Sequence, residues 1–491
     1  MKQITTCLIA ILLVVGCAKL DKEPLGVISE ASAYQTADDA IKALTSVYNT
    51  LLNYPGYDGY SIYDIAADDA EKGGEGPSDG AYFNEIAYST LTPSNTIALQ
   101  VWRNAYLGIH RANLVIENVP SIDMDQNARD RIIAEAKFLR AYNYFILVTL
   151  YGDVPLILQA DVDPGQTERT SKDLVYEQII KDLNEAIENL PLKSQFTSDE
   201  LGRVTKGAAQ AYLGKVYLYR KDFANAEIWF KKVIDSHEYG LDPDYYHIFT
   251  IAGEFGMENI FEINYTDNPQ FRSLSNQGTI RQGSAGMYGY GFTCPTQDFV
   301  DEFEQGDPRL SKTVYAGGDV LPDGKIADVG NSETGYMDLK AYLLQSEFPS
   351  TGDPRNSGKN DIKLRYGMLL LWYAEAANQN SHLQEALNAL NQVRSRARQG
   401  NPNILPDVTV TDKDQLQAKI WHEERVEYGL ENHRWFDLIR QGRAGTVLRA
   451  YAARYNSVKG KNFKDGVNEL LPIPQTEIDL SQDKLTQNPG Y

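Results

Sequence analysis

Cysteine and histidine are scarce in this chain of 491 residues, which has three cysteines and six histidines. No two histidines stand at the spacing of a metal-binding pair, and no cysteine accompanies them. The segment HEERV begins at His422 like a zinc-protease motif, but Val426 stands where the second histidine would have to be. The sequence therefore predicts no metal site and no cofactor.

Motifs for nucleophilic and phosphate chemistry are missing too. The chain has no G-x-S-x-G elbow that would mark a serine nucleophile, and no phosphate-binding glycine loop before a helix. Its 67 acidic residues leave a glycosidase carboxylate pair open, but no pair stands out. We therefore expect no enzyme, with an exported hydrolase as the remote alternative.

Two acidic clusters have simpler explanations than chemistry. The first combines acids and arginines at helical spacing, so it should tie neighbouring helices through ion pairs. Its members are Glu423, Glu424, Arg425, Glu427, Glu431 and Arg434. The second cluster, Asp68, Asp69 and Glu71, lacks the spacing of a calcium loop, so we expect a solvated acidic turn.

An excess of positive charge is also absent, because 47 Lys and Arg against 67 Asp and Glu give a net charge of −20. This balance argues against binding nucleic acid and against docking on an anionic membrane by charge. Tyrosine is abundant, at 31 residues against 16 Phe and 5 Trp. Its apolar ring and hydroxyl suit wet recognition surfaces as well as cores.

No apolar run is long enough to remain in a membrane, since a span needs about 20 residues. A long apolar stretch lies within residues 131–155, RIIAEAKFLRAYNYFILVTLYGDVP. Its first half is amphipathic at helical spacing, and its second half, Tyr144 to Tyr151, is apolar on nearly every face. We predict a core helix enclosed by other helices, which Gly152 and Pro155 end.

The N-terminus predicts export and a lipid anchor. Lys2 and the short apolar segment from Cys7 to Val15 have the form of a signal peptide. The following Gly16-Cys17 resembles the end of a bacterial lipobox, which implies cleavage before Cys17 and its acylation. The alternative is an ordinary secretory signal with a chance cysteine. With Cys7 removed and Cys17 acylated, as the lipobox resemblance implies, Cys294 would be the remaining thiol of the mature chain, so no disulfide could form within it.

Repeat spacing predicts the fold class. In residues 203–235, Leu213-Gly214, Tyr217, Ala226 and Phe230 follow the L-G-x2-Y…A-x3-F pattern of a tetratricopeptide repeat. Weaker echoes occur in residues 176–191 and 368–398. Such repeats must stack to bury their faces. We expect a mainly α, tetratricopeptide-like helical repeat scaffold with a large insertion of irregular loops and short strands.

These patterns divide the chain into five segments. The signal peptide covers residues 1–16, the lipidated tether 17–32, the N-terminal helical repeat region 33–239, the loop-rich insertion 240–360 and the C-terminal helical region 361–491. The insertion is rich in Gly, Asn, Ser, Tyr and Pro, and long loops of this kind are often functional. We therefore expect the ligand site there and in the loop 54–95.

Several segments together resemble the SusD/RagB family, the glycan-binding outer-membrane lipoproteins of Bacteroidetes. They are FLRAYNYF…LYGDVPL, PTQDFVDEFEQGDPR, LRYGMLLLWYAEAAN, HEERVEYGLENHRWFDLIRQG and LLPIPQTEIDLSQDKLTQNPGY, in the family's order. The resemblance extends from Cys17 to Tyr491 and is poor only in loops 54–95 and 264–360. It also implies that Trp102 packs within the helix bundle.

The resemblance implies a function and a partner. Such proteins capture oligosaccharide without catalysis and form a lid over a SusC-like TonB-dependent transporter in the outer membrane. This chain would accordingly be lipid-anchored there and surface-exposed, with part of its acidic surface against the barrel. The RagB branch keeps a second hypothesis open, in which the same scaffold binds a peptide or another non-carbohydrate nutrient.

Sugar binding calls for aromatic rings and hydrogen-bonding side chains held on flexible loops. The first candidate set is Tyr57, Tyr60 and Tyr63, and the second is Tyr288, Tyr290 and Phe292. Secondary candidates are Tyr82, Asn276, Gln277 and Arg281. Each ring taken alone could instead simply pack its loop. We expect at least one member of the sets to contact ligand.

Overall fold

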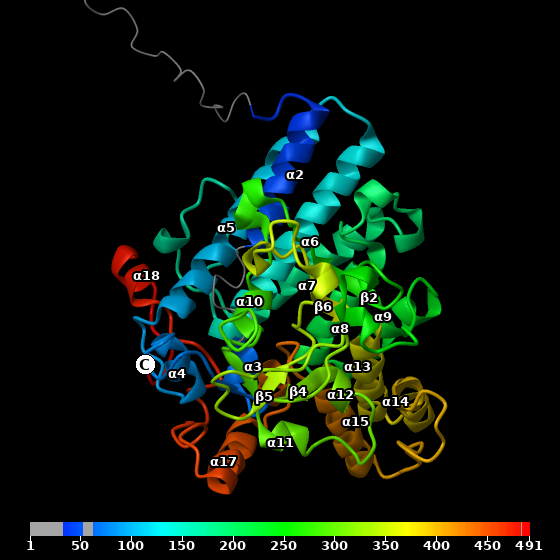
Figure 1. Ribbon diagram of the computed structural model, residues 1–491. Helices are drawn as coiled ribbons and strands as arrows, with labels where there is room; N and C mark the ends of the chain where they lie inside the picture. The colour runs from blue at the N-terminus through cyan, green and yellow to red at the C-terminus, as the bar shows by residue number, and fades with distance from the viewer. Residues whose placement is uncertain (1–32, 53–61, 483) are drawn as a thin grey trace, which may run out of the picture.

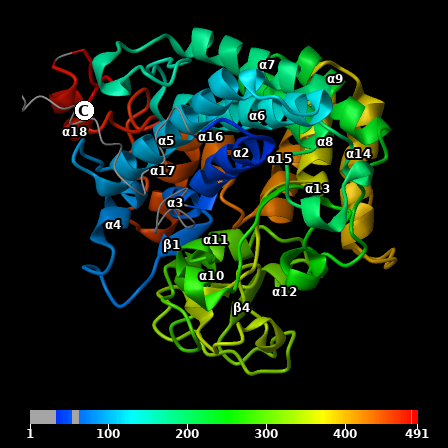
Figure 2. The same cartoon turned by 90° about the horizontal axis from the view of Figure 1, so that it is seen from above.

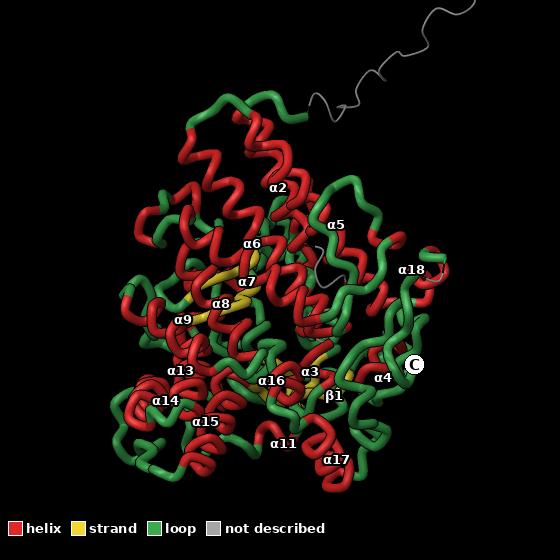
Figure 3. Tube along the Cα trace, turned by 180° about the vertical axis from the view of Figure 1, so that it is seen from behind, coloured by secondary structure: helices red, strands yellow, loops and turns green. Residues whose placement is uncertain are grey.

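The computed structural model describes residues 33–52, 62–482 and 484–491, and this part of the chain is mainly helical (Figures 1 and 3). The longer helices are α2 (Ala37–Leu52), α5 (Thr96–Asn118), α6 (Gln126–Tyr151), α7 (Lys172–Asn189), α8 (Lys206–Tyr219), α9 (Phe223–Asp235), α13 (Tyr366–Gln379), α14 (Leu383–Ala397), α15 (Lys413–Tyr428) and α17 (Ala444–Tyr455). The shorter ones are α3 (Ile62–Ala66), α4 (Ala81–Ala87), α10 (Gly278–Gln282), α11 (Gln297–Val300), α12 (Leu310–Thr313), α16 (Arg434–Arg440) and α18 (Gln475–Leu480). The mainly α prediction is confirmed. Among these helices, none combines the length and apolar character that crossing a membrane requires.

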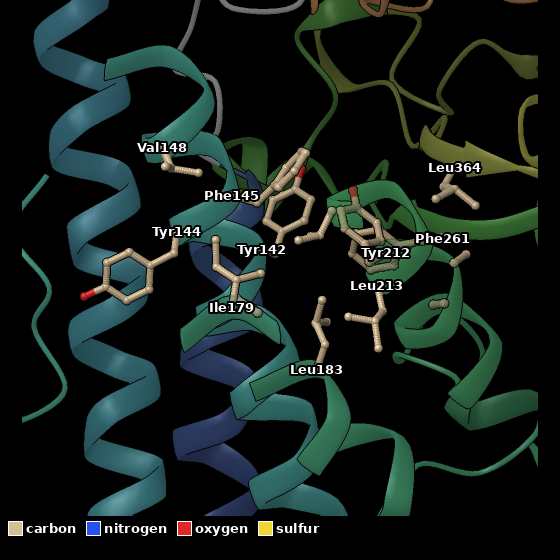
Figure 4. Close-up of a cluster of buried hydrophobic side chains, with 14 of the residues drawn as sticks. Tyr142, Tyr144, Phe145, Val148, Ile179, Leu183, Tyr212, Leu213, Phe261 and Leu364 are labelled. Atoms are coloured by element: carbon tan, nitrogen blue, oxygen red, sulfur yellow. The ribbon is translucent and has the colours of Figure 1, made fainter. Parts of the chain in front are cut away.

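The predicted core helix is α6, which packs between α5 and α7. The Asp125 side chain begins it by accepting a hydrogen bond from the Ala128 N–H, and Gly152 follows its last residue with φ +72°. Figure 4 shows its rings packed with side chains of α7 and α8. Most of its second half is buried, as predicted, but Ile146 and Thr149 stay half-buried because they face a cavity.

Helices α8 and α9 form the antiparallel pair that the repeat spacing predicts. A Cβ atom on Gly214 would stand 2.6 Å from the ring of Phe230, so only glycine lets the two helices approach this closely. Ala226 is fully buried beside this contact. Helices α13 and α14 form a second pair, and α13 packs against α9. Trp102 of α5 is buried within the helix bundle, as the resemblance implies, and its ring packs edge-on against the ring of Tyr151 in α6.

Residues 240–360 lie on one side of the helices as loops, short helices and strands (Figure 2). The strands are β1 (Ala70–Lys72), β2 (Asn259–Ile263), β3 (Thr293–Pro295), β4 (Val314–Ala316), β5 (Tyr336–Asp338) and β6 (Asp361–Arg365). They pair antiparallel as β1–β3, β2–β6 and β4–β5. Two of these pairs therefore join the loop-rich segment to sequence outside it.

Buried ion pairs centred on Glu427 hold these parts together, which confirms the predicted role of the acid–arginine cluster that runs from α15 to the start of α16. Glu427 is fully buried; its Oε1 accepts hydrogen bonds from Arg365 Nη1 at 2.7 Å and from Arg396, and its Oε2 accepts one from Arg309 Nη1 at 2.9 Å. Arg365 also donates to Glu258 Oε1 at 2.7 Å. One carboxylate thus links α15, β6, α14 and the segment before α12.

The second acidic cluster corrects the sequence prediction of a solvated turn. Asp68 and Asp69 are buried, because two arginines far along the chain neutralise them. Arg434 Nε donates to Asp68 at 2.8 Å, and Arg425 Nε donates to Asp69 at 2.8 Å. Burial alone would raise the pKa of Asp68, but Arg425 and Arg434 outweigh it and hold that pKa well below its usual range.

Replacing Glu427 with glutamine should destabilise the protein by about 3–5 kcal/mol, because three buried guanidinium groups lose their shared counter-ion. Urea unfolding followed by circular dichroism measures this change. The matched control is Glu185→Gln, which breaks the half-exposed pair between Lys137 Nζ and Glu185 at 2.6 Å and should cost less than about 1 kcal/mol. An equal decrease in the free energy of unfolding in the two variants would show that the Glu427 ion pairs stabilise the protein no more than a half-exposed pair does.

Candidate ligand-binding surface

The two tyrosine-rich loops that the sequence singles out meet at the β1–β3 pair. The N–H of Gly73 donates to the carbonyl of Phe292 at 2.9 Å, and the N–H of Gly74 donates to that of Gly291 at 3.0 Å. A Cβ on Gly73 would lie 1.9 Å from the Gly291 oxygen, so the contact requires glycine. Segments more than two hundred residues apart therefore form one surface.

A tight turn after α10 fixes the second loop. The chain doubles back, so that the Tyr290 N–H donates to the Ile280 carbonyl at 2.7 Å and the Gly291 N–H donates to the Gly283 carbonyl at 2.8 Å. A Cβ on Gly289 would stand 2.1 Å from the Gly283 oxygen. This close approach explains the glycines that separate the aromatic residues, and it sets the direction of Tyr290.

Tyr290 presents the exposed ring of this surface, with 42% of the residue accessible. Behind it lies Phe292, which is 5% exposed and meets the Tyr290 ring edge-on with centroids 6.5 Å apart. Phe292 packs on Phe83 at 5.5 Å, and Phe83 packs on the half-buried Tyr82 at 4.8 Å. The two buried rings, Phe83 and Phe292, thus lie between the half-buried Tyr82 and the exposed Tyr290.

Polar side chains lie next to Tyr290. The exposed Arg355 is held by Asp353, whose carboxylate accepts from Arg355 Nε at 2.8 Å and from Nη2 at 2.8 Å. Asp353 chiefly, and Tyr290 more weakly, raise the pKa of Arg355. The Gln277 amide donates to the Arg355 carbonyl at 2.7 Å. The Tyr290 ring is therefore near a fixed guanidinium on a turn that the Gln277 amide holds against α10, which suits a ligand with apolar faces and hydroxyl groups.

Other predicted residues have internal roles. Tyr63 is buried and packs on Phe436 with ring centroids 4.6 Å apart. The Tyr288 hydroxyl accepts a hydrogen bond from the Leu343 N–H at 2.6 Å, and burial raises the pKa of that phenol well above its usual value. Where the sequence predicts a platform of several rings, the described residues of the second loop therefore present one exposed ring.

The remaining described candidates, Arg281 and Asn276, take part in hydrogen bonds that hold the second loop. Arg281 is half-buried, and its carbonyl accepts from the Phe292 N–H at 2.9 Å. Asn276 is buried and donates to the Lys359 carbonyl at 2.7 Å, so it holds the loop. Tyr57, Tyr60 and the acylation candidate Cys17 lie outside the described residues.

Sequence reasoning missed Arg355 and Asp353. A signal was present, since Asp353-Pro354-Arg355 is a turn sequence in which the aspartate can cap the following backbone and bind the arginine. The structure has this geometry, with the Arg355 N–H donating to Asp353 Oδ1 at 3.0 Å. Nothing in the local sequence, however, indicates that this turn lies beside Tyr290.

Comparison with known proteins agrees with this architecture. Residues 257–491 match the family model described as the SusD family, and residues 29–218 match the model described as starch-binding associating with outer membrane. The chain belongs to the SusD/RagB family. A relative, SusD-like protein P2 of Formosa agariphila, is 28% identical over 99% of both chains.

Two solved structures of the family are close in fold. A laminarin-binding SusD-like protein has 29% identity and a TM-score of 0.80 over 93% of this chain and 100% of its own. Surface glycan-binding protein A from Bacteroides thetaiotaomicron, solved with laminarihexaose, has 25% identity and a TM-score of 0.79 over 92% of this chain and 100% of its own. Both support the fold and the family.

Cys294 provides a test of the β1–β3 junction. It is fully buried in β3, and burial raises the pKa of its thiol, so the reactive thiolate is disfavoured. In protein that starts after Lys22, Cys294 is the sole cysteine. We expect Ellman's reagent to label it slowly in the native state and fully in guanidinium. The control is Cys294→Ser combined with Ser198→Cys on an exposed turn, which should react at once. Equally fast labelling of native Cys294 would contradict a closed junction.

Proposed function

We propose that this protein captures oligosaccharide at the cell surface without catalysing a reaction on it. The observation that carries the proposal is the exposed Tyr290 ring beside the fixed Arg355–Asp353 pair. Sugar rings have C–H faces that lie on aromatic rings, and their hydroxyls bond to guanidinium, carboxylate and amide groups. The described residues form no cluster of histidine, cysteine and acids that could hold a metal ion, so none is invoked.

The ligand class that we propose is a neutral glucan of the laminarin type. The related structures described as binding laminarin or holding laminarihexaose support this choice. Charge supports it too, because a net charge of −20 repels polyanionic glycans over long range. Arg355 does not reverse this balance, since Asp353 already neutralises it.

Titration calorimetry with laminarihexaose tests this function, using protein that starts after Lys22. We expect binding, and we expect Tyr290→Ala to weaken it about tenfold or more because the stacking face is lost. Arg355→Ala should weaken it by a similar factor, because the ring and the guanidinium contact the same sugar.

The matched control is Trp229→Ala on α9, which removes a half-exposed ring elsewhere and should leave affinity unchanged. Unchanged binding by Tyr290→Ala would refute the proposed surface while leaving the function intact. If the folded parent bound no member of a panel of plant, host and microbial glycans, the oligosaccharide proposal would be wrong, and a peptide ligand would be the next to test.

We further propose that the protein is anchored by acylated Cys17 and delivers its ligand to a SusC-like TonB-dependent transporter. The family model's description, which places its members at the outer membrane, supports the location. The lipobox-like Gly16-Cys17 supports the anchor. Two or more acyl chains hold a protein stably on a membrane, and a tether of residues 17–32 would allow a lid to open and close.

The partner proposal predicts that the lipoprotein, extracted from native membranes in mild detergent, co-isolates with an outer-membrane barrel of transporter size. Mass spectrometry of the co-isolated bands identifies the partner. Cys17→Ser serves as the control, because without its anchor the protein should leave the membrane fraction. Repeated isolation of the anchored protein with no barrel would rule this partnership out.

A further inference from the structure

A partly open pocket of about 80 Å³ lies between helices of the scaffold, and none of the residues that line it belongs to the surface around Tyr290. Its walls come from α3, α6, α8, β6, α16 and the residues just before α16, and the α3 wall is Tyr63, a residue of the first candidate set. Figure 4 shows Tyr142 and Phe145 pointing from α6 toward Tyr212 of α8, and these rings form one wall. Such a mixed aromatic and polar lining within a core differs from an ordinary packing void, which is apolar.

Lys215 of α8 is the unusual member of this lining. It is only 6% exposed, and its Nζ lies 5.1–5.9 Å from the ring centroids of Trp372, Phe145, Tyr212 and Tyr219. Within the described part of the chain, this Nζ makes no hydrogen bond and no ion pair. The four rings stabilise the ammonium only in part, and no anion among the described residues is bound to it, so the position favours an anionic ligand.

The nearby acids are already engaged. Asp437 of α16, whose charge acts on Lys215, accepts a hydrogen bond from Arg440 Nε at 2.7 Å. Glu431 is bound by Lys340 at 2.6 Å and by Arg365 at 2.9 Å. Lys363 of β6 adds a further positive charge, although Asp361 pairs with it at 2.5 Å. The cavity is therefore positive where Lys215 faces it.

His433 adds a hydrogen-bond donor to the same cavity. It is buried between the rings of Trp372 and Tyr428, at 5.8 and 5.6 Å, and burial together with the surrounding cations lowers its pKa well below the usual value. The imidazole is therefore neutral and carries one N–H. Next to it, the amide oxygen of Asn432 is buried with no hydrogen-bond partner among the described residues. The His433 N–H is thus a donor that a carboxylate would accept, whereas the Asn432 oxygen is itself an acceptor and a carboxylate would not satisfy it.

We propose that this cavity binds a small carboxylate of two or three carbons, paired with the Lys215 ammonium and hydrogen-bonded to His433. Its short alkyl part would lie against the aromatic wall. Size supports this class, because a cavity of about 150 Å³ accepts benzene and this one is about half as large. In the absence of an anion, burial lowers the pKa of Lys215 to about 7, so the amine is then partly neutral at neutral pH.

Acetate, propionate and acetamide are the probes, titrated by calorimetry into the mature protein in detergent and a buffer free of carboxylates. We expect the two acids to bind saturably and acetamide, which has the same shape without the charge, not to bind. Lys215→Met should weaken acetate binding at least tenfold. Lys231→Met, at an exposed lysine of α9, is the matched control and should bind like the parent.

The dependence of affinity on pH separates an ion pair from a merely structural role. Because the carboxylate pairs with the charged form of Lys215, affinity for acetate should fall by up to tenfold for each pH unit above the lysine's pKa. This measurement uses the parent protein, so it tests the proposal even if Lys215→Met fails to fold. His433→Gln is a second variant, and we expect it to weaken acetate binding less than Lys215→Met does.

Several outcomes would overturn the proposal. They are the absence of saturable carboxylate binding by the parent up to about 50 mM, equal binding of acetamide, and acetate affinity that Lys215→Met or rising pH leaves unchanged. Glycan titrations run on the same variants keep the two sites apart, because Lys215→Met should not alter binding at Tyr290.

Discussion

The structure depends on one buried carboxylate, that of Glu427, which is the shared counter-ion of several arginines. Glu427 serves three arginines from separate parts of the chain, and it is surrounded by acids and bases that are themselves paired. A buried carboxylate is stable only when its counter-charges are present, so the segments that supply them must come together at once. Burial alone would bring the same segments together without fixing their register. The ion pairs therefore set where the loop-rich segment sits on the helices.

Buried lysines extend this principle into the loops. Lys340 donates to the Gly429 carbonyl at the end of α15 at 2.8 Å, and Lys359 donates to the Tyr342 carbonyl at 2.7 Å. Each ammonium satisfies backbone oxygens that no regular helix or sheet would satisfy. A segment with little regular secondary structure thus acquires defined geometry, and Tyr290 and Arg355 are presented on a fixed support.

The sequence predicts much of the scaffold and less of the site, for physical reasons. The α6 core and the Gly214–Phe230 contact follow from spacing along one helix or one helix pair, so local sequence carries them. The turn after α10 directs Tyr290 outward, but Tyr288 is held inward by the N–H of Leu343, which lies far away in sequence, so no local pattern distinguishes Tyr290 from Tyr288. Lys215 is hidden for a related reason, because a lysine within a repeat helix has the pattern of a solvent-facing residue until its neighbours are known.

The β1–β3 pair also bears on when the surface forms. Its strands are separated by most of the N-terminal helices, and Asp68 behind it binds Arg434 across 366 residues. Contacts between such distant residues form late, since the intervening chain must first be ordered. The N-terminal helices can pack while the C-terminal part is still being made or exported. The ligand surface cannot, because Tyr290 and Arg355 come later in the chain than those helices, so an N-terminal fragment would hold part of the scaffold without the means to bind.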